Sequence, residues 1–364
     1  MRKIKVALKS NSYKIVISTL EKDFLKSLKK AIPSKNAFVI TDSNVAKLHQ
    51  EIFCRALKKA GYKVSTAIIP AGETGKNIKV LSDLYDKALK SGLDRKSFVV
   101  ALGGGVVGDA AGFFAATYMR GIPFVQVPTT LLAMTDSSVG GKTAVNVAGG
   151  KNIVGCFYQP ALVWINVNFF ATLPERQIRN GMAEVLKYTF IFSKKFYAYL
   201  QETLEKGIFG EEEFNNIIYQ CCCFKAKVVK KDEKEVSGIR EVLNFGHTLA
   251  HAVETATGYK KFLHGEAVAI GMLYAAKLSQ YLKLCNKETC LQIENLLADA
   301  DLIFKLKRLS ASKLVALMKK DKKSVNSTLR FVLIKKIGKT SAGVEVKDAV
   351  ALKVLNDFLK GKNK

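Results

Sequence analysis

Short apolar runs, separated by segments with helical spacing, occupy the first half of the chain. They predict strands at residues 37–41, 64–69, 98–102 and 124–127. Residues 1–18 alternate apolar and polar positions, which predicts another strand rather than a signal peptide. Continuous apolar runs between helices are typical of a parallel sheet buried on both faces. The pattern therefore predicts a Rossmann-like α/β domain, whose ligands bind at the carboxyl ends of the strands.

The pattern changes after about residue 168. Longer segments with helical spacing are found at residues 181–192, 211–231, 244–257 and 266–282. One late apolar run, residues 329–334, predicts a strand. A length of 364 residues also favours two domains. We therefore expect an α/β domain over residues 1–168 and an all-α domain over residues 169–364, packed closely with a cleft between them.

The charge balance is strongly basic. Lysine and arginine number 58 against 31 aspartates and glutamates, which gives a net charge of +27. The lysines are spread along the chain, whereas nucleic-acid-binding proteins usually cluster them in one stripe. We interpret the charge as a solvated basic surface that speeds encounters with anionic ligands. The positive charge also suggests nucleic-acid binding as an alternative function, but no sequence motif supports it.

Cysteine usage and one apolar segment bear on the compartment. The seven cysteines include three in a row and no CxxC pair, which argues against a disulfide framework or a thiolate zinc site and predicts a reducing, cytoplasmic setting. Residues 97–119 carry Asp109 as their only charge and are long enough to span a bilayer. Because glycines interrupt this segment and an aspartate is costly inside a bilayer, we predict a buried strand, turn and helix instead of a membrane span.

A glycine-rich turn lies in the middle of that segment. The sequence GGGVVGD at residues 103–109 follows a predicted strand and opens a helix. Backbone amides exposed by glycine and a helix N-terminus suit a diphosphate, although a tight strand-to-helix connection is the alternative reading. Asp42, after an earlier strand, has the chemistry of a ribose acceptor and equally that of a helix N-cap.

Three of the four histidines lie close together in the sequence. His247 and His251 are four residues apart and share one helix face, and His264 precedes the next helix. Catalytic zinc commonly takes three nitrogen or oxygen ligands and leaves one position open. A metal site that uses two of these histidines would therefore need a carboxylate as its third ligand.

Three glutamates could supply that carboxylate. Glu184 lies in the otherwise apolar segment GMAEVLKYTFIF, and a buried charge needs a metal or a cation beside it. Glu254 and Glu266 are rivals because they are close in sequence to the histidines. The residue pattern leaves the choice open.

Cationic and amide side chains gather in glycine-rich segments. DSSVGGK at residues 136–142 follows the fourth predicted strand, and Lys151 and Asn152 follow a pair of glycines. Glycine allows close approach of a ligand, and lysine supplies point charges for phosphate or carboxylate. Arg240 and Asn244 would share a face with the first histidine if that stretch is helical. Together these features predict hydride chemistry on an anionic substrate, with a metal polarising an oxygen.

Five segments in order carry a specific resemblance. They are GGGVVGDAAGFFAATYMRGIPFVQVPTTLLAMTDSSVGGKTAVN, GKNIVGCFYQP, TLPERQIRNGMAEVLKY, LNFGHTLAHAVE and HGEAVAIGM. Between about residues 42 and 331 the chain resembles the 3-dehydroquinate synthase family of sugar phosphate cyclases. The resemblance implies a lyase of the shikimate pathway that converts 3-deoxy-D-arabino-heptulosonate 7-phosphate into 3-dehydroquinate and phosphate. It also implies transient oxidation by NAD+, β-elimination, reduction, ring opening and aldol closure, with a zinc or cobalt ion.

The resemblance also assigns the metal ligands and the partner subunit's contribution. Glu184, His247 and His264 match the family's metal ligands, which leaves Glu254 and Glu266 outside the site. The family forms homodimers in which the residue that matches Arg120 reaches the substrate phosphate of the other subunit.

Two larger sets of residues match the substrate and cofactor sites. The substrate set is Asp136, Lys142, Asn152, Lys187, Lys225, Arg240, Asn244 and His251, with one of Lys322 and Lys323. The NAD+ set is Asp42, Asn44, Glu73, Lys76, Gly104, Gly105, Asp109, Thr129, Thr130, Lys142, Lys151, Phe169, Thr172 and Gln177. A pocket with several cations suits a substrate that carries both a carboxylate and a phosphate.

The chain departs from the family pattern at three places. Val147 stands where a polar residue or histidine is expected, and Asn166 stands where aspartate is usual. One extra residue lies between Lys225 and Arg240, so Lys227 is an alternative to Lys225 in the pocket.

Sister cyclases such as 2-epi-5-epi-valiolone synthase and 2-deoxy-scyllo-inosose synthase are the alternative function. They act on similar substrates and differ in pocket residues. Lys225, Asn244 and His251 agree with the dehydroquinate branch. Glycerol-phosphate and metal-dependent alcohol dehydrogenases are more distant, because they lack the DSSVGGKT and GKN segments together.

Overall fold

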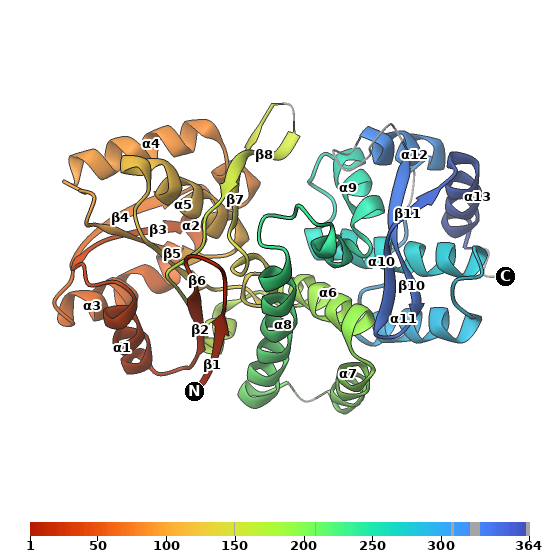
Figure 1. Ribbon diagram of the computed structural model, residues 1–364, viewed down its shortest axis with the longest axis horizontal. Helices are drawn as coiled ribbons and strands as arrows, with labels where there is room; N and C mark the ends of the chain where they lie inside the picture. The colour runs from red at the N-terminus through yellow and green to blue at the C-terminus, as the bar shows by residue number, and fades with distance from the viewer. Residues whose placement is uncertain (149, 208, 307–308, 321–327, 362–364) are drawn as a thin grey trace. The chain divides into compact units, whose positions relative to one another are not determined.

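The computed structural model describes residues 1–148, 150–207, 209–306, 309–320 and 328–361 (Figure 1). Lys322 and Lys323, one of which is predicted to face the substrate, lie outside the described residues. Contacts divide the chain into two compact units. The first consists of Met1–Ile178 and Phe214–Lys234, and the second consists of Arg179–Glu213 and Glu235–Lys364.

This division differs from the predicted one, which separates two continuous domains at residue 168. The helix α8 (Glu211–Lys231) belongs for most of its length to the first unit. Its Cys222 thiol donates to the Met134 carbonyl at 3.3 Å, and its Lys225 ammonium lies 2.8 Å from a carboxylate oxygen of Asp136. Helical spacing predicts the element correctly, but it does not show which part of the chain the buried face contacts.

A seven-stranded sheet forms the core of the first unit. Its strands lie in the order β1 (Arg2–Val6), β2 (Tyr13–Ile17), β9 (Leu162–Ile165), β6 (Phe124–Pro128), β5 (Phe98–Gly103), β3 (Asn36–Asp42) and β4 (Lys63–Ile69). Only the pair β1–β2 is antiparallel among these strands. The predicted Rossmann-like α/β fold is confirmed, including the four predicted apolar strands β3, β4, β5 and β6, of which β4 lies at the edge of the sheet. The four-residue strand β9 was not predicted.

Helices cover both faces of this sheet. They are α1 (Glu21–Ala31), α2 (Ser43–Val45), α3 (Glu51–Lys59), α4 (Ile78–Lys90) and α5 (Gly105–Thr117). Figure 1 shows α4 and α5 on one side of the sheet and α1 and α3 on the other. On the α1 side, Phe24 stacks on Trp164 with ring centroids 4.6 Å apart. On the α5 side, Phe38 and Phe114 belong to one buried cluster.

The apolar segment that raised the question of a membrane span is β5 and the buried helix α5. Glycines let this helix pack closely on its neighbours: a Cβ on Gly112 would lie 2.4 Å from a Thr143 methyl, and one on Gly108 would lie 2.8 Å from the Gln126 amide. Among the described residues, no helix is both long and apolar enough to cross a membrane. The prediction of a strand, turn and helix here is confirmed.

A two-stranded hairpin extends from the first unit. Strands β7 (Lys142–Val147) and β8 (Gly150–Phe157) pair in antiparallel register, with Thr143 opposite Cys156. The parallel bridge between Asn77 and Asn146 joins it to the start of α4. The hairpin carries two of the predicted site residues, Lys151 and Asn152, on β8.

The second unit is mainly helical. It contains α7 (Lys194–Lys206), α9 (His247–Ala256), α10 (His264–Tyr281), α11 (Lys287–Asp299), α12 (Ala311–Lys320), α13 (Asp348–Leu359) and most of α6 (Glu175–Phe192). Strands β10 (Leu329–Lys336) and β11 (Lys339–Val346) form an antiparallel pair beside these helices. The late strand and the mainly helical character of this part of the chain are therefore confirmed. The second strand of the hairpin, β11, is the addition that the sequence did not predict. The apolar helix α10 lies at the centre, and its Ser279 hydroxyl accepts the Ile334 amide at 3.0 Å.

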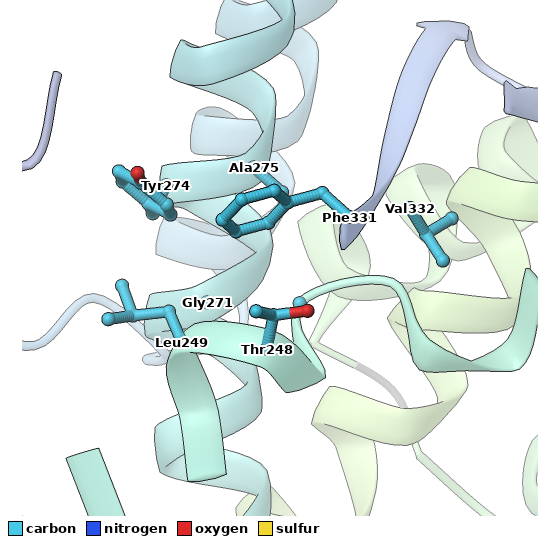
Figure 2. Close-up of a pocket in the computed structure, with 8 residues that line it drawn as sticks. Thr248, Leu249, Gly271, Tyr274, Ala275, Phe331 and Val332 are labelled. Atoms are coloured by element: carbon cyan, nitrogen blue, oxygen red, sulfur yellow. The ribbon is translucent and has the colours of Figure 1, made fainter. Parts of the chain in front are cut away.

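Two glycines allow a close crossing in the second unit. A Cβ on Gly271 of α10 would lie 1.9 Å from the carbonyl oxygen of Gly246, the residue before α9. Gly246 itself has a φ of +84°, which favours glycine. Figure 2 shows the lining of the hollow at this crossing, with Leu249 from α9, Tyr274 from α10 and Phe331 from β10. These side chains leave no room for a water-sized ligand, so the hollow is a packing feature.

Candidate metal, cofactor and substrate clusters

Glu184, His247 and His264 come together in the second unit. Their ligand atoms all lie within 4.8 Å of one another. One carboxylate oxygen of Glu184 lies 3.6 Å from Nε2 of His247 and 3.6 Å from Nε2 of His264. Two imidazole nitrogens and one buried carboxylate are a donor set typical of catalytic zinc. The residues that the structure brings together therefore fit a divalent ion.

Close packing of α10 against α6 places two of these ligands. A Cβ on Gly265 would lie 1.9 Å from the carbonyl oxygen of Asn180, and the Gly265 amide donates to the Asn180 side chain at 2.6 Å. His264 is the residue before Gly265, and Glu184 lies one turn of α6 after Asn180. Glycine at position 265 is thus needed for the approach that joins the carboxylate to this histidine.

The third ligand is placed by the glycine crossing. Because Gly246 contacts Gly271 without side chains between them, α9 begins close to α10. His247 is the first residue of α9, and its ring centroid lies 5.4 Å from that of His264. The glycines of LNFGHT and HGEAVAIGM therefore have a mechanical role in forming the cluster.

Charged neighbours surround the cluster. Glu184 forms an ion pair with Lys187, and both side chains are at most 2% exposed. Glu254 lies 3.4 Å from Nδ1 of His264, on the ring nitrogen opposite the cluster. Burial lowers the pKa of His264, but the interactions with Glu184 and Glu254 outweigh it and raise this pKa well above its usual range. A divalent ion bound here would have to replace a proton on that ring.

The rival carboxylates have other contacts. Glu254 does not join the three-residue cluster, but its contact with His264 orients the ring, as carboxylates commonly do for metal-binding histidines. Glu266 accepts the Leu263 amide at 2.9 Å and so caps α10. His251 lies beside His247 with ring centroids 5.6 Å apart, outside the cluster.

The stretch before His247 is not one helix. Arg240 and Asn244 lie in a short 3₁₀ segment, Ile239–Asn244, and Gly246 with its left-handed φ separates that segment from α9. The condition under which Arg240, Asn244 and His247 would share one helix face is therefore not met. Arg240 is nevertheless 2% exposed, which makes it a buried cation in the same unit as the cluster.

The glycine turn of the first unit begins α5. Gly104 is the N-cap and has an ordinary φ of −76°. Close neighbours leave little room for a side chain here: a Cβ on Gly104 would lie 3.2 Å from Thr130, and one on Gly105 would lie 3.0 Å from the Ser137 hydroxyl. The amides of this helix N-terminus stand at the carboxyl end of β5, where phosphate groups bind in folds of this class.

Asp42 acts as a helix N-cap in this structure. Its Oδ1 accepts the amides of Asn44 and Val45 at 2.8 and 3.1 Å. The alternative role as a ribose acceptor stays a prediction. His49, which sequence reasoning did not single out, lies 2.7 Å from the Thr172 hydroxyl and has its ring 4.9 Å from that of Phe169. A lone histidine in a helical segment gives no signal of this contact.

A polar network joins several residues of the predicted NAD+ set. The buried Lys76 ammonium pairs with Asp109 and donates to the Asn152 side chain at 2.6 Å. Lys151 lies 3.2 Å from the Glu73 carboxylate. Burial opposes ionisation of Glu73, but Lys151 and other polar neighbours outweigh it and lower its pKa. Burial dominates at Asp109 and raises its pKa despite the pairing with Lys76.

Lys225 is the residue that faces Asp136. Its ammonium donates to the Asp136 carbonyl at 2.7 Å and lies 2.8 Å from the carboxylate. Lys225 is buried, whereas Lys227 is exposed. Of the two lysines that the extra residue left open, Lys225 is thus the one beside Asp136, and its place in the substrate pocket stays a prediction.

The remaining predicted site residues differ in their exposure and in their place in the fold. Lys142 and Arg120 are exposed, Thr129 is buried, and Gln177 is near the start of α6. Met119 and Arg120 have φ values of +51° and +67°, which are rare for residues with side chains.

Family models match most of the chain. The model described as 3-dehydroquinate synthase N-terminal matches residues 66–180, and the model described as 3-dehydroquinate synthase C-terminal matches residues 181–324. The chain belongs to the 3-dehydroquinate synthase family. The predicted family resemblance is thereby confirmed.

Full-length relatives agree with this family. The 3-dehydroquinate synthase of Endomicrobium trichonymphae is 61% identical over 100% of both chains. That of Thermoanaerobacter pseudethanolicus is 45% identical over 97% of this chain and 99% of its own.

Two solved structures of sugar phosphate cyclases share the fold. A 2-deoxy-scyllo-inosose synthase, complexed with carbaglucose-6-phosphate, NAD+ and Co²⁺, is 25% identical with a TM-score of 0.89, and the match covers 98% of this chain and 100% of that one. The 2-epi-5-epi-valiolone synthase from Streptomyces hygroscopicus, with NAD+ and Zn²⁺ bound, is 25% identical with a TM-score of 0.87 and coverages of 98% and 99%. Both belong to the sister branch considered from the sequence.

Proposed function

We propose that this chain catalyses the reaction of its family and converts 3-deoxy-D-arabino-heptulosonate 7-phosphate into 3-dehydroquinate and phosphate. The observation that carries the proposal is the buried cluster of Glu184, His247 and His264 in a chain 61% identical to a 3-dehydroquinate synthase. A divalent ion would polarise the hydroxyl that is oxidised, and NAD+ would accept and return the hydride. Glu184, His247 and His264 are the residues that would hold the ion.

The remaining roles fall to charged residues of the chain. Lys187, at most 2% exposed and paired with Glu184, supplies a fixed positive charge beside the metal ligands. Lys225, held by Asp136, supplies another in the first unit. Charges fixed by such contacts can stabilise the anions formed during elimination without reorganising. Lys142, Asn152, Arg240, Asn244 and His251 complete the proposed substrate set.

The cofactor groups are proposed for the first unit. The N-terminus of α5 at Gly104 and Gly105 would bind the diphosphate, and Asp42 and Asn44 would lie near the adenosine ribose. The network around Glu73, Lys76, Asp109 and Lys151 would hold the rest of the dinucleotide, with Thr129, Thr130, Phe169, Thr172 and Gln177. The cytoplasmic location expected from the cysteines stays a prediction.

Phosphate release tests the proposed reaction. We expect release from the heptulosonate phosphate to require NAD+, to stop after chelation, and to return with Zn²⁺ or Co²⁺, because both bound groups supply chemistry that side chains lack. Heat-treated protein controls for spontaneous release, and omission of NAD+ controls for a contaminating phosphatase, which needs no NAD+. If the protein binds NAD+ and metal but releases no phosphate, the reaction is not the proposed one. Release from sedoheptulose 7-phosphate would then assign the chain to a sister cyclase.

We also propose that the enzyme is a homodimer in which Arg120 serves the partner's substrate phosphate. Arg120 is exposed and held in a left-handed conformation, a kind of backbone strain that is common at functional sites. The hairpin strand β8 exposes Ile153, Val154 and Phe157 at 45%, 37% and 39%. An apolar strand of this kind is a surface that a second copy could cover.

Mixed dimers test the exchange of Arg120. Arg120→Ala and Glu184→Gln are each expected to be inactive alone. After co-refolding at equal ratio, we expect about a quarter of the wild-type activity, because half of the dimers are mixed and one of their two sites is intact. Phosphate release measures this recovery. No recovery in a sample that contains mixed dimers by native mass spectrometry would place Arg120 in its own subunit's site.

A further inference from the structure

Asn146, near the end of β7, has no assigned role and lies between two predicted binding sites. Its side-chain amide donates to Oε2 of Glu73 at 2.8 Å, and its side-chain oxygen accepts the backbone amide of Asn152 at 3.0 Å. Glu73 belongs to the predicted NAD+ set, and Asn152 belongs to the predicted substrate set. One side chain thus holds a residue of each set.

The backbone around Asn146 is fixed as well. Its amide donates to the Lys76 carbonyl at 2.8 Å, which joins the hairpin to the loop between β4 and α4. The Lys76 ammonium reaches back to the Asn152 side chain at 2.6 Å. Loop and hairpin are therefore tied by contacts in both directions. Asn146 makes two of them, to Glu73 and Lys76, and its third hydrogen bond, to Asn152, lies within the hairpin.

Asn152 needs these contacts to keep its conformation. Its φ is +55°, in the left-handed region that residues with a side chain occupy at a cost. Such a conformation persists only when its surroundings hold it. Asn146 holds the backbone of Asn152, and Lys76 holds its side chain. Removing Asn146 would release the backbone to the ordinary extended region and move the amide that is proposed to bind substrate.

Glu73 depends on the same side chain. Its two carboxylate oxygens are shared between Asn146 and Lys151, on either side of the hairpin turn. The Asn146 donor directs one oxygen toward the hairpin and leaves the orientation of the carboxylate fixed. Without it, Glu73 would keep one partner and gain rotational freedom.

We propose that Asn146 is a positioning residue that holds Glu73 for NAD+ and Asn152 for the substrate, and so couples the two binding sites. The inference rests on the proposed function for the roles of Glu73 and Asn152. It adds that the cofactor loop and the hairpin adopt their binding conformations together, through the side-chain amide of Asn146.

Two substitutions at this position separate the contacts. Asn146→Ala removes both side-chain contacts, and we expect the Kd for NAD+ and the KM for the heptulosonate phosphate each to rise about threefold to tenfold, with a smaller change in kcat. Asn146→Asp keeps the acceptor for Asn152 but places a carboxylate against Glu73. We expect it to raise the Kd for NAD+ by a similar factor and to leave the substrate KM within about twofold of wild type.

Asn77→Ala is the matched control. Asn77 lies on the same loop, accepts the Val80 amide as the N-cap of α4 and donates to the Thr74 carbonyl, and its side chain contacts neither Glu73 nor Asn152 in the described structure. We expect this variant to lower the melting temperature and to leave both binding constants near wild type.

Three results would decide against the inference. Wild-type NAD+ affinity in Asn146→Ala would show that Asn146 does not position Glu73. Equal substrate KM values in the alanine and aspartate variants would show that the acceptor for Asn152 has no role. If Asn77→Ala weakened NAD+ and substrate binding as much as Asn146→Ala does, the effect would be explained by the stability of the loop alone. The NAD+ titration needs no turnover, so it tests Asn146 even if wild-type protein released no phosphate and the proposed reaction failed.

Discussion

Glu184→Gln is expected to abolish tight binding of a divalent ion and to lower phosphate release by about a thousandfold, which corresponds to about 4 kcal/mol of transition-state stabilisation. The substitution keeps the shape of the side chain but removes the charge that faces both His247 and His264. It also leaves the buried Lys187 ammonium without its carboxylate partner. Metal content after dialysis and phosphate release with added Zn²⁺ or Co²⁺ measure the two effects.

Glu266→Gln is the control for this substitution. Glu266 is also a buried glutamate close to His264 in sequence, and its contact with the Leu263 amide caps α10. We expect Glu266→Gln to reduce stability modestly and to retain metal. Normal metal content in Glu184→Gln would remove Glu184 from the ligand set. Loss of metal in both variants would mean that the packing of α10, rather than the charge of Glu184, determines binding.

Gly271→Ala is expected to destabilise the second unit by about 3 kcal/mol and to weaken metal binding together with stability. An alanine in a helix interior usually stabilises by up to about 1 kcal/mol relative to glycine. Here the added Cβ would meet the Gly246 carbonyl at 1.9 Å, and backbone atoms cannot yield as a side chain can. Overpacking of this kind typically costs about 1–3 kcal/mol. Urea unfolding and metal titration measure both effects.

Gly210→Ala is a suitable comparison in the same unit. Its Cβ would meet only the far end of the Glu213 side chain, at 2.9 Å, and that carboxylate can move. We expect stability and metal affinity near wild type. Unchanged stability in Gly271→Ala would mean that α9 and α10 can separate without loss. Lower stability with unchanged metal affinity would mean that the crossing does not place His247.

The sequence predicts the elements of the fold better than their partners. Continuous apolar runs identify β3, β5 and β6, because a strand buried on both faces needs no polar positions. The edge strand β4 is only partly buried, and a shorter apolar run identifies it. β9 is only four residues long, LVWI, and gives too little pattern to be recognised. The spacing in α8 predicts a helix with a buried face, but it does not indicate which segment of the chain packs against that face.

The candidate site shows a similar division. Charge burial and ligand chemistry make Glu184 a candidate metal ligand, yet the residue pattern alone cannot choose between Glu184, Glu254 and Glu266. The four-residue spacing of His247 and His251 suggests a pair, whereas the cluster joins His247 with His264 through glycine contacts between helices. The sequence resemblance supplies the choice, because it carries three-dimensional information that spacing lacks. Asn146 gives no signal in the sequence, since its proposed role depends on contacts with residues 73 and 152.

Because α8 belongs to the first unit but follows a segment of the second unit in sequence, the order of synthesis affects how the first unit folds. The first unit contains Met1–Ile178 and Phe214–Lys234, so its last helix is synthesised after a segment of the second unit. A nascent chain that has emerged from the ribosome only as far as residue 178 lacks Lys225 and the apolar face that includes Cys221 and Cys222. The contacts of Asp136 and Met134 with α8 therefore cannot form at that stage. The α/β unit can complete its folding only after translation has passed residue 234. If the gene were split at a single point between the codons for residues 178 and 235, at least one of the two fragments would consequently lack part of its unit.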